Sequence, residues 1–449
     1  MHFYPRGNVF YRRLTKPFPR IVLGEGCWLE DADGKRYLDA CGGAFVACLG
    51  HGNTEIAAAM AEQAGRIAYV NGTAFTTDPV EQLAGELAKT LPGDLDHLYF
   101  LSSGSEAVEA ALKLARQYWA ECGLPAKRKI LALSAAYHGN TLLALSASAR
   151  EHYKTYVRDW MVDVIRVPVP CFRCACRGDD PTCATCTGNA LEAAIERAGP
   201  DTVAAFIAEP VGGSSTGAAV PRAEYFRTVR EICDRHQVLF IADEVLCGAG
   251  RTGTWWAIEP FGVAPDLMTV GKGIAAGYAP LSAVAAPRRI IDVLAQGAGS
   301  LFHAQTFSFH PVACAAGLAT VRTLRAHGLV QRCAELGAVF HRKLAGLSSL
   351  PNVGAVRGCG LLAGIEFVED TKLGTPLPRA LRFAETFTEQ ALAVGLVVWP
   401  NVGHVDGTQG DLVMLAPPFI VTEVELDEIV SRFATALDWT LAAVSAGVR

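Results

Sequence analysis

The chain has 449 residues, of which 51% are apolar and 19% are charged, and its formal net charge is −5. It is long enough for two or three domains with a large buried core. The sequence has no basic run of the kind that binds nucleic acid, and no uninterrupted apolar stretch of about 18 residues that could cross a membrane. The N-terminus is basic but lacks the apolar segment of a signal peptide. These features predict a soluble, cytoplasmic protein.

From about residue 95, apolar segments typical of β-strands alternate with amphipathic or alanine-rich helices. The first such helix is expected at 105–119, where apolar residues recur at helical spacing. The expected strands are 98–103, 129–134, 203–210, 238–245, 266–270 and 280–287. Continuous apolar strands separated by helices predict an α/β fold whose sheet is mostly parallel and covered on both faces.

The pattern changes after a helix that begins at Pro311 and ends near Gly328. Further on, 360–368 and 395–400 are expected as strands, and a closing helix is expected from about residue 422. The division that we predict is an N-terminal segment 1–50 that joins the small domain, a large domain 51–328 with a cysteine-rich insertion at 168–188, and a small α+β domain 329–449.

Lys272 is the first candidate for chemistry. It follows an apolar strand and lies between Gly271 and Gly273, with no neighbouring acid. Burial disfavours the charged form of a lysine, and the neutral amine is a nucleophile that forms Schiff bases. Taken alone, a surface lysine on a glycine turn is the simpler interpretation.

Two carboxylates precede Lys272 at the ends of expected strands. Asp243 would lie at the carboxyl edge of the sheet, where open α/β sheets bind ligands. It could hold the nitrogen of a pyridinium ring protonated, or it could simply cap a helix. Glu209 ends an earlier strand in the same way.

Two loops nearer the N-terminus could hold the rest of a cofactor. Gly104 and Ser105 form a strand-to-helix turn whose backbone N–H groups would face an anion, although many glycine turns bind nothing. Tyr137 and His138 follow another strand, where an aromatic ring could lie over a flat ligand or belong to the core. In chain order these features are a phosphate turn, an aromatic residue, two strand-end carboxylates and a lysine.

The sequence resembles the class III aminotransferases, which are pyridoxal-phosphate-dependent enzymes of fold type I, and among them most closely the amine and ω-amino acid:pyruvate transaminases. The likeness runs over nearly the whole chain. It rests on motifs such as "SSGSEAVEAALKLAR", "YHGNT", "IAEPV", "IADEVLCGAGRTG", "GKGIAAGYAPLSAV" and "TFSFHPVACAAG". The fold that it implies has a large domain with a mostly parallel seven-stranded sheet and a smaller α+β domain built from both chain ends.

The resemblance also implies roles for residues. Lys272 would form the Schiff base with pyridoxal 5′-phosphate, Asp243 would pair with the pyridine nitrogen, and Glu209 would complete the catalytic group. The implied cofactor-binding residues are Ser103, Gly104, Ser105, Tyr137, His138, Asp243, Val245, Lys272 and, from a neighbouring subunit, Thr306. Homodimers, or tetramers of dimers, with shared active sites are implied as well.

The reaction implied is transfer of an amino group from an amine or ω-amino acid to a 2-oxo acid such as pyruvate, with ping-pong kinetics. Two alternatives stay open at this point. One is another class III reaction type, such as that of an aminomutase, a decarboxylase or a lyase. The other is a non-enzymatic, zinc-bearing binding protein.

The residue two positions before Ala416-Pro417-Pro418 departs from the family. Many members have an arginine there that binds a substrate carboxylate, but this chain has Met414, and no arginine occurs between Arg382 and Arg432. Since a guanidinium is the usual partner of a carboxylate, we expect an N-terminal arginine or another group in the pocket to take that role.

The segment "CFRCACRGDDPTCATC" holds five of the 14 cysteines. Cys171, Cys174, Cys183 and Cys186 form two Cys-x-x-Cys pairs, which is the spacing of a tetrahedral thiolate zinc site. We therefore predict a structural zinc; free thiols, disulfides or an iron–sulfur cluster are the alternatives, and Cys176 leaves the ligand set open. The other nine cysteines are scattered singly, as is typical of free buried thiols in a reducing compartment.

Overall fold

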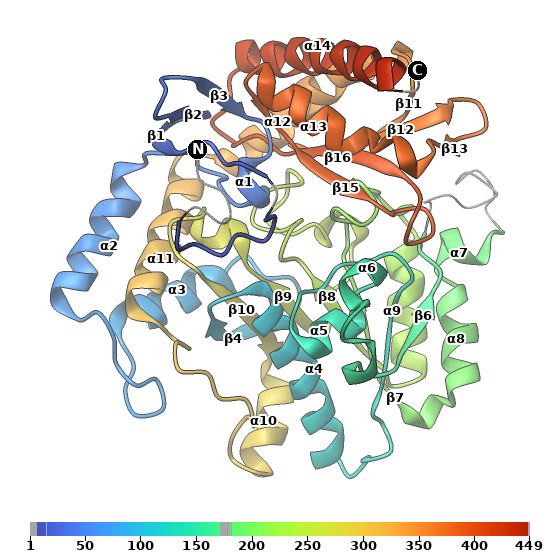
Figure 1. The fold of residues 1–449 in the computed structure, drawn as a ribbon. Coiled ribbons are helices and arrows are strands. Elements are labelled where there is room, and N and C mark those ends of the chain that lie inside the picture. The colour runs from blue at the N-terminus through green and yellow to red at the C-terminus, as the bar shows by residue number, and fades with distance from the viewer. Residues whose placement is uncertain (1–6, 15, 171–179, 181, 448–449) are drawn as a thin grey trace.

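The computed structural model describes residues 7–14, 16–170, 180 and 182–447. Its described strands form one large sheet and two smaller sheets. The large sheet lies at one end of the molecule, and the two smaller sheets lie together at the other end (Figure 1). No helix in this part of the chain combines the length and the apolar character that a membrane span needs.

The large sheet has seven strands in the order β4-β10-β9-β8-β7-β5-β6. They are β4 (Leu95–Leu101), β5 (Lys129–Leu133), β6 (Val164–Val167), β7 (Val203–Ala208), β8 (Leu239–Asp243), β9 (Leu267–Val270) and β10 (Ser282–Pro287). Strands β5 to β9 pair in parallel, whereas β10 is antiparallel to both of its neighbours. The predicted mostly parallel, seven-stranded sheet is confirmed, and β6 is the strand that had not been located in the sequence.

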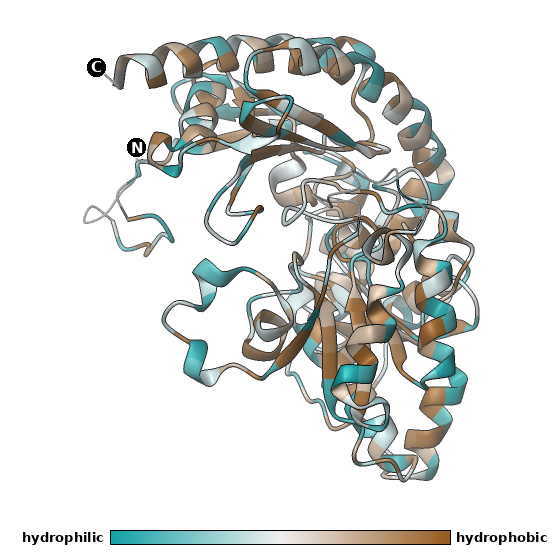
Figure 2. Cartoon of the chain, turned by 90° about the vertical axis from the view of Figure 1, so that its right-hand side faces the viewer, coloured by the Kyte–Doolittle hydropathy of each residue, from teal (hydrophilic) through white to brown (hydrophobic). Residues whose placement is uncertain are grey.

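Helices cover both faces of this sheet, which explains why every residue of β7 and β8 is buried. One face packs against α4 (Gly104–Glu121), α5 (Leu142–Ala147) and α10 (Arg288–Gln296). The other packs against α3 (Asp78–Ala88), α8 (Ala190–Ala198), α9 (Tyr225–Arg235) and α11 (Pro311–Ala326). Figure 2 shows the consequence, with hydrophobic ribbon concentrated in the strands between these helices. The remaining helices of the large part are α1 (Gly42–Phe45), α2 (Thr54–Arg66), α6 (Glu151–Lys154) and α7 (Ala184–Thr187).

The two smaller sheets combine the two ends of the chain. One has the order β1-β2-β3-β14, and the other the order β11-β12-β16-β15, with β13 paired to β12. Their strands are β1 (Ile21–Glu25), β2 (Trp28–Asp31), β3 (Arg36–Asp39), β11 (Val353–Cys359), β12 (Leu362–Asp370), β13 (Thr375–Pro376), β14 (Leu396–Val397), β15 (Trp399–Val402) and β16 (Asp411–Leu415). They share a core with α12 (Leu329–Ala345), α13 (Phe383–Ala393) and α14 (Glu423–Gly447).

The pairing of β3 with β14 joins the two ends directly, since Leu38 lies opposite Leu396. The small α+β domain built from both chain ends is thereby confirmed, while its exact boundaries stay a prediction. The expectation of one strand at 395–400 is wrong. The segment divides at Val398, so that β14 joins the N-terminal sheet and β15 joins β16.

Candidate functional site

The parallel strands bring the predicted site residues to one edge of the large sheet. Asp243 is the last residue of β8, Glu209 follows β7, Tyr137 and His138 follow β5, and Lys272 follows β9. Because β5, β7, β8 and β9 run in the same direction, their carboxyl ends meet at the same edge.

Asp243 is the most firmly held member of this group. Its side chain is buried, and its Oδ2 lies 2.7 Å from Nδ1 of His138. Its Oδ1 accepts hydrogen bonds from the Thr269 hydroxyl at 2.9 Å and from the backbone N–H of Val245 at 3.1 Å. Because both of its oxygens have hydrogen-bond partners, the carboxylate is held in one orientation at the carboxyl ends of the strands.

Lys272 combines a strained backbone with a half-buried side chain. Its φ of 43° lies in the left-handed region, which is uncommon for a residue other than glycine. Burial lowers the pKa of the Lys272 amine, and the negative charges of Asp243 and Glu209 oppose this only in part. The neutral, nucleophilic form of the amine is therefore more accessible than in an ordinary lysine.

Glu209 is buried between two backbone amides. Tyr137 N–H donates to its Oε2 at 3.2 Å, and Gly213 N–H donates to its Oε1 at 3.0 Å. Burial raises the pKa of Glu209, while the neighbouring His138 lowers it. The carboxyl group therefore also fixes the loop that carries the Tyr137 ring.

The strand-to-helix turn at the start of α4 lies against the same group. Ser103 caps this helix, and a side chain in place of Gly104 would meet Cγ1 of Val245 at 2.6 Å, so only glycine fits. The Ser105 hydroxyl accepts a hydrogen bond from the N–H of Asn140 at 2.9 Å, which ties the turn to the loop after β5. The unpaired N–H groups of the first helical turn make this place suitable for an anion.

Thr306 is exposed on the loop before α11 rather than inside the group. The preceding Gln305 donates from Nε2 to Ser102 Oγ at 3.1 Å and to Glu106 Oε1 at 2.7 Å, so the loop is tied to the turn of its own chain. A contact of Thr306 with a neighbouring subunit stays a prediction.

With this geometry in place, comparison with known proteins becomes informative. The family model for class-III aminotransferases matches residues 11–437. The chain belongs to the class-III aminotransferases. Membership of an enzyme family excludes the alternative of a non-enzymatic binding protein.

Related sequences agree with this assignment. The aminotransferase is 38% identical to an uncharacterized aminotransferase of Schizosaccharomyces pombe, over 98% of this chain and 96% of that one. It is 32% identical to the putrescine–pyruvate aminotransferase of Pseudomonas aeruginosa, over 97% and 94% of the two chains.

Solved structures share its fold. An (S)-enantioselective ω-transaminase from Thermomicrobium roseum superposes with a TM-score of 0.89 at 35% identity, covering 98% of this chain and 96% of that one. An amine transaminase from an uncultivated Pseudomonas species, in its PLP-bound form, gives 0.88 at 34% identity, with 98% of both chains covered. The predicted fold type I is thereby confirmed.

Some residues that the structure places near this group were missed in the sequence. Thr269 lies in the otherwise apolar β9, and a polar residue in such a strand was a usable signal. Arg150 and Asn401 had no motif around them, and they come together only through the fold, 251 positions apart.

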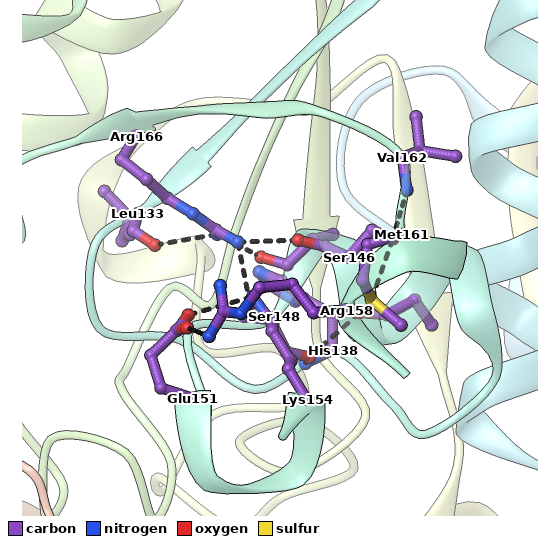
Figure 3. A network of polar contacts seen from close by, with 12 residues as sticks. Leu133, His138, Ser146, Ser148, Glu151, Lys154, Arg158, Met161, Val162 and Arg166 are labelled. Carbon is purple, nitrogen blue, oxygen red and sulfur yellow. Dashed lines mark hydrogen bonds and ion pairs between the residues drawn. The ribbon is translucent and has the colours of Figure 1, made fainter. Parts of the chain in front are cut away.

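A second network of hydrogen bonds in the aminotransferase holds the backbone of His138 in place (Figure 3). Arg166 on β6 donates to the carbonyl oxygens of Ser146 at 2.6 Å, Ala147 at 2.5 Å and Ser148 at 2.7 Å, which closes the C-terminal end of α5. The Ser148 hydroxyl in turn accepts a hydrogen bond from His138 N–H at 2.8 Å. Arg166 therefore stabilises the loop from which His138 reaches Asp243.

We expect Arg166→Met to lower the unfolding midpoint of the aminotransferase by about 2–4 °C, because three carbonyl groups lose a charged donor worth about 2 kcal/mol in total. Differential scanning fluorimetry measures the change. Arg158→Gln is the matched control, since Arg158 is 62% exposed and pairs with Glu151 at the surface. Its midpoint should move by no more than about 1 °C, and equal shifts in both variants would contradict the role of Arg166.

The predicted zinc site lies partly outside the described residues, because Cys171, Cys174 and Cys176 belong to 171–179. Cys186 is buried in α7, and Cys183 directly precedes this helix. Within the described ranges, no group of three or more His, Cys, Asp or Glu side chains is placed to hold a metal. Nothing in the aminotransferase structure supports zinc, and the site stays a prediction.

The nine cysteines outside that segment form no disulfide with one another or with other described residues. Seven are buried, in agreement with the expected free thiols, whereas Cys122 is exposed and Cys359 is half-buried. Burial raises the pKa of Cys48, Cys233 and Cys314 to about 12, so these thiols are unreactive at neutral pH.

Proposed function

We propose that the protein transfers an amino group from an amine or ω-amino acid to a 2-oxo acid such as pyruvate, with pyridoxal 5′-phosphate as its cofactor. The observation that carries this proposal is that two groups occur together at the carboxyl edge of the sheet: the firmly held, buried Asp243 and the half-buried Lys272, whose pKa is lowered. The activity named for the Pseudomonas aeruginosa relative, and the cofactor named for the PLP-bound amine transaminase, support it.

The residues at this edge fit the proposed cofactor. Asp243 offers a fixed anionic acceptor to a protonated ring nitrogen, and the start of α4 offers N–H groups and the Ser103 and Ser105 hydroxyls to a phosphate. Tyr137 and Val245 could pack against the two faces of a flat ring. His138 Nε2 is buried and has no hydrogen-bond partner among the described residues, which leaves a polar atom available beside the site.

Bound pyridoxal phosphate supplies an electron sink that stabilises negative charge on the carbon bearing the amine. The chain's own residues then have distinct tasks. The amine of Lys272 would take the proton from the carbon that carries the donor's amino group, and would deliver it to the cofactor carbon on the other side of the nitrogen. Asp243, whose carboxylate is fixed by His138 and Thr269, would hold the ring nitrogen of the cofactor protonated.

Because the cofactor-loaded enzyme would retain the amino group between the two halves of the reaction, the donor's carbonyl product would leave before the 2-oxo acid binds. Initial-rate plots at several pyruvate concentrations should accordingly give parallel lines in double-reciprocal form. Intersecting lines would contradict the proposed order.

The test of the reaction itself is nitrogen balance. Purified protein loaded with the cofactor is incubated with pyruvate and a panel of amines and ω-amino acids, including putrescine and β-alanine. We expect one alanine for each amine consumed. Consumption of the amine without any alanine would favour a mutase, decarboxylase or lyase reaction instead.

We also propose a homodimer, or a tetramer of dimers, with active sites at the subunit interface. Several large apolar side chains are exposed on the isolated chain, among them Phe10, Leu23, Phe75, Phe302 and Phe307. Exposed apolar surface on this scale favours a protein–protein contact. Light scattering of the purified protein should give at least twice the mass of one chain, and a monomer would contradict the proposal.

A further inference from the structure

The place at which many relatives bind a substrate carboxylate is apolar in this chain. Met414 on β16 is fully buried, and it lies opposite Trp399 of β15 in the antiparallel pairing. The same cluster contains Phe45, whose ring centroid is 5.5 Å from that of Trp399. A carboxylate against this wall would lose its hydration without gaining a partner.

A cation lies on a different side of the site. Arg150 follows α5, and its guanidinium carbon is 5.8 Å from the centroid of the Tyr137 ring. The backbone of Tyr137 is held by Glu209, and the next residue, His138, contacts Asp243. Arg150 therefore lies beside the aromatic residue of the candidate site.

The hydrogen bonds of Arg150 all go to neutral side chains. Its Nε donates to Ser215 Oγ at 3.1 Å, its Nη2 donates to Ser214 Oγ at 2.6 Å, and its Nη1 donates to Asn401 Oδ1. Among the described residues, no carboxylate lies within ion-pair distance of the guanidinium. A half-buried cation that is held in place but has no counter-ion favours the binding of an anion.

A second donor accompanies the cation. Asn401 is only 5% exposed, and its Nδ2 has no hydrogen-bond partner in the part of the chain that the structure describes. Arg150, Ser215 and Asn401 together line a cavity of about 510 Å³. Both acidic residues at the same cavity are already bonded: Glu151 to Lys154 and Arg158, and Asp406 to the N–H groups of Thr408 and Gln409. A buried amide without an acceptor beside a guanidinium is a complementary pair for the two oxygens of a carboxylate.

We propose that Arg150, together with the side-chain amide of Asn401, binds the carboxylate of the 2-oxo acid and of amino acid substrates. This inference rests on the proposed function and identifies its acceptors as carboxylates rather than plain carbonyl compounds. When an amine without a carboxylate binds, Ser214 and Ser215 keep the guanidinium hydrogen-bonded, so that one pocket accepts both kinds of substrate.

The test compares pyruvate with acetaldehyde, in which a hydrogen replaces the carboxylate, as acceptors for one amine donor without a carboxylate. In Arg150→Met, the ratio of kcat/KM for pyruvate to kcat/KM for acetaldehyde should fall about 100-fold, mainly through KM. Arg150→Lys, which keeps the charge but not the planar fork, should recover part of the ratio. An unchanged ratio, or equal losses with both acceptors, would overturn the proposal.

A binding measurement gives an answer that does not depend on turnover. Calorimetric titration of the cofactor-loaded protein with propionate, an unreactive carboxylate, should show a Kd at least about 10-fold higher in Arg150→Met than in the unmodified chain. Asn401→Ala should raise the Kd by a smaller factor. An identical Kd in all three proteins would also overturn the proposal.

Arg12→Gln is the matched control. Arg12 comes from the N-terminal segment, and its Nη2 donates to Tyr153 OH at 2.8 Å, so it is the other arginine near Tyr137. Its substitution should change the pyruvate to acetaldehyde ratio by less than about threefold. A large fall here, with none in Arg150→Met, would assign the carboxylate to the N-terminal segment. If neither acceptor receives an amino group, the proposed function fails, and propionate binding still decides the role of Arg150.

Discussion

Lys272→Ala should lower the rate of amino transfer by at least about 10⁴-fold, because no other described side chain at this edge combines a nucleophilic amine with the lowered pKa of Lys272. The loss should appear in both half-reactions when each is followed by single-turnover absorbance. Lys272→Arg should be equally inactive, since a guanidinium keeps its proton at neutral pH.

A folding defect is not expected in Lys272→Ala. Removing a partly desolvated amine takes away an unfavourable burial, so the unfolding midpoint should stay the same or rise slightly. Added methylamine should restore part of the proton transfer if Lys272 acts as the base. An alanine variant that keeps more than about one hundredth of the activity would contradict the assignment of Lys272.

Asp243→Asn should lower kcat about 10³-fold, equivalent to about 4 kcal/mol in the barrier. The substitution keeps the size of the side chain and one acceptor oxygen, but it removes the negative charge that would hold the ring nitrogen of the cofactor protonated. Affinity for the cofactor should fall as well, and an absorbance titration of the cofactor-free protein with pyridoxal phosphate measures it.

Asp266→Asn is the control for Asp243→Asn. Asp266 is equally buried but lies at the opposite end of β9, where it pairs with Arg230 and accepts a hydrogen bond from Phe240 N–H. Its loss should lower the unfolding midpoint while kcat stays within about threefold of the unmodified enzyme. Comparable losses of kcat in the two variants would show that Asp243 acts through stability alone.

The residues at the strand ends could be predicted because the sequence pattern of each strand and the geometry of a parallel sheet lead to the same placement. Asp243 ends and Lys272 follows a short, mostly apolar strand, and parallel strands place such positions at one edge whatever the details of packing. The glycine at 104 was similarly predictable, because a turn that binds an anion needs close approach, and here Val245 occupies the space a side chain would take.

The rest depends on contacts between distant segments. Arg150 and Asn401 meet across the gap between the large sheet and β15, and no pattern in either segment specifies the other. The division of 395–400 into β14 and β15 likewise follows from pairing partners, since a two-residue strand has no periodicity of its own. The cysteine-rich segment shows the converse, because a conspicuous spacing led to a metal prediction that no described contact supports.

The pairing of Leu38 in β3 with Leu396 in β14 has a consequence for synthesis of the protein. Strand β3 can pair with β2 at once, but it leaves the ribosome long before β14 exists, and at about 5–20 residues per second the delay is on the order of 20–70 seconds. The strands of the large sheet are all translated within that interval. The open edge of β3, with the buried Leu38, therefore stays without its β14 partner until the ribosome has almost finished.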